Sequence, residues 1–477
     1  MTKLVGRKEE TKILMEAYAS PEAEMVSIIG RRRVGKTFLV KSVFGDQIDF
    51  EAIGIQKAPL SEQLQNFTLL LNQTFYDGAP VLTPTNWLQA FHQLGAALDK
   101  KKKSDRMVVF LDELPWFDSH KSGFVRALGH FWNSWAVNRN VLVIICGSSA
   151  SWMIKNVLRN KGGLHNRVTK RIRLKPFTLA ETETYLQSRG VHLDHYHILL
   201  IYMAMGGVPH YLKEIAGHRS AAQNIGYICF SENGLLKDEF MSLYPALFDH
   251  ADYHLAIIRA LAAKHYGMVR SEIVKNIPFP DSGRVTKVLE ELMESGFVTE
   301  YYPFGKKKKE RIFRLSDEYS LFYLRFIEKN RNEDEQIWEQ ISQSQEYKTW
   351  SGYAFENICL KHIPQIKKAL GISGIYASAS TFVKTGSGND PGIQIDLLID
   401  RSDHVINLVE IKFNNTAITL SQADSNALRE KLRIFRESTG AKKMVNWVML
   451  STFGVKSNAH SLGSLAASLD MECLFDG

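Results

Sequence analysis

Three groups of residues in this 477-residue sequence have the types and spacing that chemistry requires. The first is the loop GRRRVGKT, from Gly30 to Thr37, which joins an apolar segment to an amphipathic one. Gly30 and Gly35 let backbone N–H groups close around phosphate oxygens, and the N-terminus of the following helix adds a favourable dipole. We expect Lys36 to reach the terminal phosphates of ATP and the Thr37 hydroxyl to hold Mg²⁺. The arginines between the glycines are expected to be solvated loop residues.

The second group follows two further apolar segments. Residues 107–111, in RMVVFLDELPWF, have the composition of a central parallel strand that ends at Asp112 and Glu113. We expect Asp112 to lie beside Mg²⁺ and Glu113 to orient and deprotonate the attacking water, although an acid pair also caps strand ends. The segment NVLVIICGSS ends in Ser148 and Ser149, which are placed to sense the γ-phosphate.

The third group lies near the C-terminus, in HVINLVEIKFNN. Strand side chains alternate, so Glu410 and Lys412 share one face. The preceding strand of the predicted hairpin carries Asp396, and a helix before it carries Glu356. Carboxylates that hold Mg²⁺, with a lysine that positions or activates water, are the requirements of metal-dependent phosphodiester hydrolysis. The alternative is a structural ion pair between Glu410 and Lys412 in an inactive scaffold.

Residues 251–330 are predicted to form a winged helix, because three helical segments precede a hairpin. The recognition-type helix spans 282–295 and exposes Arg284 and Lys287. The tip of the hairpin carries four consecutive lysines, Lys306, Lys307, Lys308 and Lys309. We expect these cations to contact nucleic-acid phosphates, although lysines at a hairpin tip are often only solvated and winged helices also bind proteins.

Composition is that of a soluble globular protein, with 45% hydrophobic and 23% charged residues. The net charge of +8 mildly favours an anionic partner, nucleic acid first. Four scattered cysteines indicate a reducing compartment, the N-terminus lacks the apolar run of a signal peptide, and no segment is apolar for the length of a membrane span. We expect a cytoplasmic protein without membrane contact.

In order, the segments LVGRKEE, the Gly30–Thr37 loop, FLDELPW, CGSSASWM, GGLHNRVTKRIRLKPFTLAE and GGVPHYL resemble the archaeal-type ATPases of the STAND branch of AAA+ proteins. The resemblance covers about the first half of the chain. It implies that Gly6 and Arg7 lie near the adenine and that Pro209 helps a helical lid to pack over the nucleotide. It also makes Arg167 a candidate to touch the γ-phosphate of its own or a neighbouring subunit, and nearby Arg171 or Arg173 are alternatives.

From residue 351 onward the chain resembles the PD-(D/E)XK nuclease fold, and also the nuclease-like domain of unknown function that often accompanies these ATPases. The shared pattern is the helical Glu356 followed by Asp396, Glu410 and Lys412. Two departures put substrate geometry in doubt. Gln394 stands where many relatives carry another acid, and VKTGSGNDPG replaces an aromatic and basic segment. Gln422 is a candidate accessory residue.

The sequence therefore predicts an α/β multidomain protein. The expected boundaries are 1–178 for a P-loop ATPase core, 179–250 for the lid, 251–330 for the winged helix, 331–350 for a linker, and 351–477 for the nuclease-like domain. ATP and Mg²⁺ are the expected cofactors, with DNA as the partner and a homo-oligomer as a possible assembly. The expected function is an ATPase coupled to DNA binding and to a nuclease-like domain, in defence or mobile-element biology. The alternatives are an ATP-dependent DNA-binding regulator and a signalling scaffold with an inactive nuclease fold.

Overall fold

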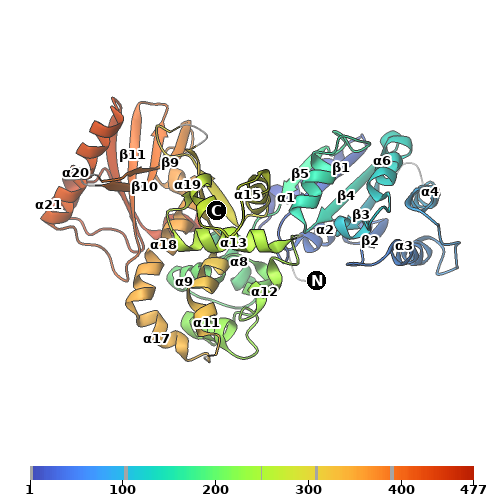
Figure 1. Cartoon of the computed structure of the whole chain (residues 1–477), viewed down its shortest axis with the longest axis horizontal. Helices are drawn as coiled ribbons and strands as arrows, with labels where there is room; N and C mark the ends of the chain where they lie inside the picture. Colours follow the sequence, from blue (N-terminus) through green and yellow to red (C-terminus); the bar gives the residue numbers. More distant parts are fainter. Residues whose placement is uncertain are drawn as a thin grey trace. The chain divides into compact units, whose positions relative to one another are not determined.

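The chain folds into two compact units (Figure 1). The computed structural model describes residues 4–100, 106–248, 250–306, 310–332, 334–386 and 392–476. The first unit comprises Met1–Lys175, Pro245–Asp249 and Glu294–Gly296, and the second comprises Pro176–Tyr244, His250–Met293 and Phe297–Gly477.

The first unit contains a parallel five-stranded sheet in the order β2-β3-β4-β1-β5. Its strands are β1 (Glu24–Ile29), β2 (Phe50–Ile53), β3 (Met107–Asp112), β4 (Val141–Gly147) and β5 (Lys170–Arg173). Every residue of β3 and β4 is buried, which is why both were apolar runs without alternation. The two strands predicted from those runs are confirmed.

Helices cover both faces of this sheet. One face packs against α1 (Lys8–Ala19) and α2 (Lys36–Phe44). The other face packs against α3 (Leu60–Phe75), α4 (Trp87–Leu98) and α6 (Phe124–Ser134). Two short helices, α5 (Leu114–Phe117) and α7 (Ala150–Met153), begin just after β3 and β4. Because parallel strands end at the same edge, the segments after β1, β3 and β4 converge there.

The second unit begins with helices, as expected for residues 179–250. They are α8 (Leu179–Ser188), α9 (His195–Met205), α10 (Pro209–Leu212), α11 (Ala221–Phe230) and α12 (Glu239–Leu243). Thr178 and Glu181 form a reciprocal capping box that starts α8. Helix α9 is apolar on nearly every side because seven of its eleven residues are buried.

The segment 251–330 contains the three expected helices, α13 (Ala251–Ala263), α14 (Arg270–Lys275) and α15 (Gly283–Glu294). One face of α15 is buried, through Val285, Val288, Leu289 and Leu292. The predicted hairpin is present as two antiparallel strands, and a short third strand pairs with the second of them, which gives a three-stranded antiparallel sheet in the order β6-β8-β7. Its strands are β6 (Met268–Val269), β7 (Val298–Tyr301) and β8 (Ile312–Leu315). A two-residue strand such as β6 is too short to produce a periodic signal.

Helices connect this segment to the last sheet. They are α16 (Glu318–Phe322), α17 (Ile337–Gln343), α18 (Gln345–Lys361) and α19 (Ile363–Ala369). The polar segment 331–350, expected as a linker, includes α17 and the start of α18. Its Trp338 is buried, with its ring 5.0 Å from that of Phe322. That aromatic contact ties α17 to α16.

The last sheet is mixed, in the order β13-β12-β11-β10-β9. Its strands are β9 (Ala377–Lys384), β10 (Ile393–Arg401), β11 (Val405–Lys412), β12 (Met444–Ser451) and β13 (Ala467–Leu469), and the remaining helices are α20 (Gln422–Thr439) and α21 (Ala459–Leu462). The predicted β10–β11 hairpin is confirmed, since Leu397 pairs with Val409 in antiparallel register. Across the described residues, no helix has the length and apolar character needed to cross a membrane.

Candidate functional sites

The loop after β1 has the backbone that a phosphate cradle needs. Gly35 has φ 92°, a conformation that side chains rarely adopt. At Gly30, an added Cβ would lie 2.4 Å from the carbonyl oxygen of Leu174, so only glycine fits. The expectation that the loop arginines are all solvated is wrong for Arg31, which is 2% exposed.

Lys36 lies inside this loop and not in solvent. Its Nζ donates to the carbonyl oxygens of Gly30 at 2.9 Å and Arg31 at 3.0 Å, and to the Ser148 hydroxyl at 3.3 Å. Burial lowers the pKa of Lys36, and the charge of Glu113 opposes that shift. The ammonium is thus held where phosphate oxygens can replace the loop carbonyls as acceptors.

The acids after β3 meet the loop across β4. Strand β4 lies between β1 and β3, so Ser148, at its end, stands between Lys36 and Glu113. The Thr37 hydroxyl donates to Asp112 Oδ2 at 2.5 Å. Burial raises the pKa of Asp112, while its bond from Thr37 lowers it. Oxygen ligands from a hydroxyl and a buried carboxylate suit Mg²⁺, so Thr37 and Asp112 fit the expected ion.

Glu113 is oriented by its backbone and by Ser148. Its φ of 47° is unusual for a side-chain-bearing residue and points to a functional constraint. Its carboxylate accepts from the Ser148 backbone N–H at 3.1 Å and from the Ser148 hydroxyl. Ser148 therefore links the predicted base to Lys36, a role that the sequence did not indicate.

Of the nucleotide contacts implied by resemblance, Arg7 lies at the loop, and Gly6 precedes it in a left-handed conformation with φ 63°. Arg7 is 4% exposed, and its Nη2 donates to the Val34 carbonyl at 3.2 Å. Arg167 is exposed on the segment before β5, and its alternative Arg173 is ion-paired with Glu294. Pro209 begins α10 in the second unit. The roles of Arg167 and Pro209 stay predictions.

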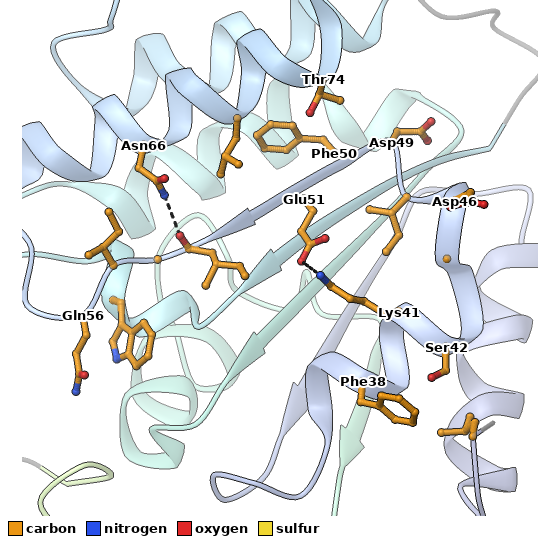
Figure 2. A pocket seen from close by; sticks show the side chains of 18 residues that line it. Phe38, Lys41, Ser42, Asp46, Asp49, Phe50, Glu51, Gln56, Asn66 and Thr74 are labelled. Carbon is orange, nitrogen blue, oxygen red and sulfur yellow. Dashed lines mark hydrogen bonds and ion pairs between the residues drawn. The ribbon is translucent and has the colours of Figure 1, made fainter. Parts of the chain in front are cut away.

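A separate hollow of about 1760 Å³ lies outside the edge strand β2 (Figure 2). Its lining includes Phe38 and Lys41 from α2 and Glu51 from β2, but no residue of the Gly30–Thr37 loop. Lys41 Nζ lies 2.8 Å from Glu51 Oε1, so this lysine is held away from the phosphate loop.

In the second unit, Asp396 and Glu410 lie on neighbouring strands. Asp396 precedes the Leu397–Val409 pair and accepts from the Ile411 backbone N–H at 2.9 Å and from Gln394 Nε2 at 3.1 Å. Burial, reinforced by the charges of Glu356 and Glu410, raises the pKa of Asp396 to about 7. The predicted carboxylates are therefore close enough to repel one another.

Glu410 is bound by two lysines. Its carboxylate oxygens lie 2.8 Å from Lys412 Nζ and 2.8 Å from Lys431 Nζ. Burial raises the pKa of Glu410, but the charges of these two lysines outweigh burial and hold the pKa below its ordinary value. Lys431 belongs to α20 and was missed, because nothing in the sequence shows which residue of a distant helix faces β11. Gln422, the suggested accessory residue, is exposed and donates to Asn426 at 3.0 Å.

Glu356 is bound by an arginine from β8. Arg314 Nη1 donates to Glu356 Oε1 at 2.7 Å, and both residues are buried. In the parts of the chain that the structure describes, no group of three or more His, Cys, Asp or Glu side chains is arranged to hold a metal ion. The predicted Mg²⁺ role of Asp396 and Glu410 therefore stays a prediction, while the described structure pairs Glu356 with Arg314, and Glu410 with Lys412 and Lys431.

The predicted nucleic-acid residues lie on the 251–330 segment. Arg284 is exposed with its guanidinium 4.0 Å from the ring centre of Tyr253, and Lys287 Nζ is 3.6 Å from Glu291. Lys306 Nζ is 3.7 Å from Glu310. The other three lysines of the tip, Lys307, Lys308 and Lys309, are outside the described residues.

Comparison with known proteins finds a relative along most of the chain and an ATPase family model in its N-terminal part. An uncharacterized protein of Methanocaldococcus jannaschii is 22% identical over 421 residues, which cover 86% of this chain and 88% of that protein. The Walker-type ATPase PABY2304 of Pyrococcus abyssi has a similar fold, with 16% identity, a TM-score of 0.50, and coverage of 68% of this chain and 98% of that one. The family described as "ATPase domain predominantly from Archaea" matches residues 4–215. Those residues therefore carry an ATPase domain of the archaeal type.

Proposed function

We propose that the protein binds and hydrolyses ATP and uses this cycle to control a DNA-processing module in its second unit. The observation that carries the ATPase part is the convergence of Lys36, Thr37, Asp112 and Glu113 at one edge of the sheet. Lys36 binds the terminal phosphates, while Ser148 keeps Glu113 oriented towards the attacking water. Mg²⁺, held by Thr37 and Asp112, would neutralise charge on the phosphates.

Two further assignments belong to the same proposal. Arg167 contributes charge stabilisation at the γ-phosphate, and Pro209 belongs to a helical lid that responds to the nucleotide. The 251–330 segment acts as a winged helix whose Arg284, Lys287 and Lys306 contact DNA phosphates.

The C-terminal module is proposed to cleave phosphodiesters through Glu356, Asp396, Glu410 and Lys412. Lys412 and Lys431 line a cavity of about 300 Å³ in which Glu410 also lies. Two lysines beside buried carboxylates suit an anionic backbone, since each offers a charge-assisted donor to a phosphate oxygen. Glu356 and Glu410 are ion-paired in the conformation described here, so cleavage would require their release.

The first test is steady-state ATP hydrolysis by Lys36→Ala, with Lys41→Ala as a matched control. Both lysines lie on α2, but Lys41 is paired with Glu51. Loss of the phosphate donor should lower hydrolysis by about 10²- to 10³-fold, with the control near wild type. Equal activities of Lys36→Ala and wild type would overturn the ATPase assignment.

A second function is favoured by the paired carboxylates themselves. If Glu356 and Glu410 are permanently ion-paired, the protein is an ATP-dependent DNA-binding regulator or a signalling scaffold. Asp396→Asn would then cause no change in DNA cleavage. A gel-shift assay of DNA binding would separate the regulator, which binds DNA, from the scaffold, which does not.

A further inference from the structure

Arg314 lies on β8, the second strand of the β7–β8 hairpin, and is only 3% exposed. Its Nη1 donates to Glu356, whereas the equally buried Nε and Nη2 have no acceptor among the described residues. A buried guanidinium with most of its donors unused is costly. The ion pair with Glu356 offsets part of that cost. A cation that binds Glu356, or a movement of β8 that withdraws Arg314, could break this pair.

The hairpin that carries Arg314 is attached to the last sheet at a second point. Near its tip, the backbone N–H of Phe304 donates to the Thr381 carbonyl of β9 at 2.9 Å. The Phe304 ring lies 5.7 Å from that of Phe435 on α20 and packs against the core of that sheet. The β7–β8 hairpin is thus held to the rest of the second unit both at Phe304 and at Arg314.

Neighbouring residues of the 251–330 segment face the same cluster. The His265 ring stacks on Tyr353 of α18, with centroids 3.5 Å apart. Tyr266 lies close enough to Glu356 and Asp396 for their charges to act on its phenol. These contacts place the segment directly beside the carboxylates.

We propose that the β7–β8 hairpin is a built-in closure of the carboxylate cluster, in which Arg314 binds Glu356 in place of a divalent cation. The inference rests on the proposed nuclease function, since it names how that site is held inactive. Opening requires the hairpin to leave β9, which withdraws the guanidinium and frees Glu356 next to Asp396. The hairpin also bears Lys306, so a nucleic acid bound there would compete with its docking on β9.

Mn²⁺ binding to the nucleotide-free full chain tests the closure without relying on activity. All proteins carry Thr37→Ala so that the phosphate loop does not contribute, and free Mn²⁺ is measured by electron paramagnetic resonance. Arg314→Met should bind Mn²⁺ at least about tenfold tighter than the parent, because the ion no longer displaces a buried counter-charge. Adding Asp396→Asn should abolish the gain.

The matched control is Arg311→Met, which removes an arginine that precedes β8 and pairs with Glu300 at 2.7 Å. It should leave Mn²⁺ binding unchanged. Phe304→Asp weakens the contact between the hairpin and the last sheet while keeping Arg314. This variant therefore provides a second test of the closure if Arg314→Met does not fold. It too should tighten Mn²⁺ binding.

Unchanged Mn²⁺ affinity in both Arg314→Met and Phe304→Asp would overturn the closure, as would tight binding by the parent. The same substitutions are also made in a chain that keeps Thr37, and plasmid nicking by these proteins is measured. This assay separates failure of the closure from failure of the nuclease assignment. Tight Mn²⁺ binding without nicking supports the closure and rejects the nuclease. Nicking by wild type that Arg314→Met does not increase rejects the closure and supports the nuclease.

Discussion

The two candidate sites place similar groups in opposite states. At the phosphate loop, Lys36 is bonded to backbone carbonyls and a hydroxyl, which are neutral acceptors that a phosphate readily replaces. At the C-terminal cluster, Glu356 and Glu410 are bonded to full positive charges. Exchanging a neutral partner costs less than breaking a buried ion pair. The first site is therefore ready for its ligand, whereas the second requires a conformational change.

The largest expected effect comes from Glu113 at the ready site. Glu113→Gln keeps the size of the side chain and its contact with Ser148 but cannot accept a proton. Hydrolysis should fall by about 10²- to 10⁴-fold while ATP binding remains. Single-turnover hydrolysis and nucleotide-binding titrations measure the two quantities. Weakened binding with unchanged turnover of the bound ATP would show that Glu113 is only a strand-end cap.

The helix that carries Glu356 is anchored by a neutral histidine. His362 donates from Nδ1 to the Ile358 carbonyl at 2.8 Å and accepts at Nε2 from the Leu179 N–H at 3.3 Å. Burial lowers the pKa of His362 to about 4. Since the unfolded state takes up the proton first, stability should fall as pH drops from about 6.5 to 4, by about 3 kcal/mol in total.

The contribution of His362 is isolated by comparing urea unfolding of wild type and His362→Gln at several pH values. Glutamine keeps a donor and an acceptor but does not titrate, so its stability should decrease less over this pH window. Identical pH slopes for the two proteins would contradict the assignment.

A smaller effect is expected at Lys431, which sharpens the contrast between the sites. Lys431→Met removes one of the two cations on buried Glu410 and should destabilise the protein by about 1–3 kcal/mol. Arg429→Met, an exposed change on the same helix, should stay within about 0.5 kcal/mol. Denaturant midpoints measure both. If Lys431→Met leaves the free energy of unfolding unchanged, the ion pairs of Glu410 are too weak to distinguish the C-terminal cluster from the phosphate loop.

The smallest effect concerns DNA. Arg284→Ala with Lys287→Ala should reduce the salt dependence of DNA binding by about 2 in the slope of log K against log salt. Stability should change little, because both side chains are exposed. Fluorescence anisotropy with labelled duplex over a range of NaCl concentrations gives the slope. An unchanged slope would remove α15 from the DNA-contact surface.

Local patterns were enough to predict the elements that carry chemistry. The apolar run before Asp112 predicted β3, and the alternation around Asp396 and Glu410 predicted the β10–β11 hairpin. The partners of these residues were not predictable in the same way. Arg314 and Lys431 belong to distant segments, and a basic residue on a hairpin or an amphipathic helix gives no sign that it will be buried against an acid. Tertiary packing decides that, and it pairs Glu356 and Glu410 with cations that the sequence analysis did not connect to them.

The most direct test of this contrast measures both sites in the same proteins. ATP hydrolysis and Mn²⁺-dependent plasmid nicking are measured for wild type and for Arg314→Met. The nicking assays contain no ATP. The account predicts equal ATP hydrolysis by the two proteins, with nicking by Arg314→Met well above that by nucleotide-free wild type. Measurable nicking by wild type in the absence of ATP that Arg314→Met does not increase would show that the C-terminal site is as ready as the phosphate loop, and would contradict the account.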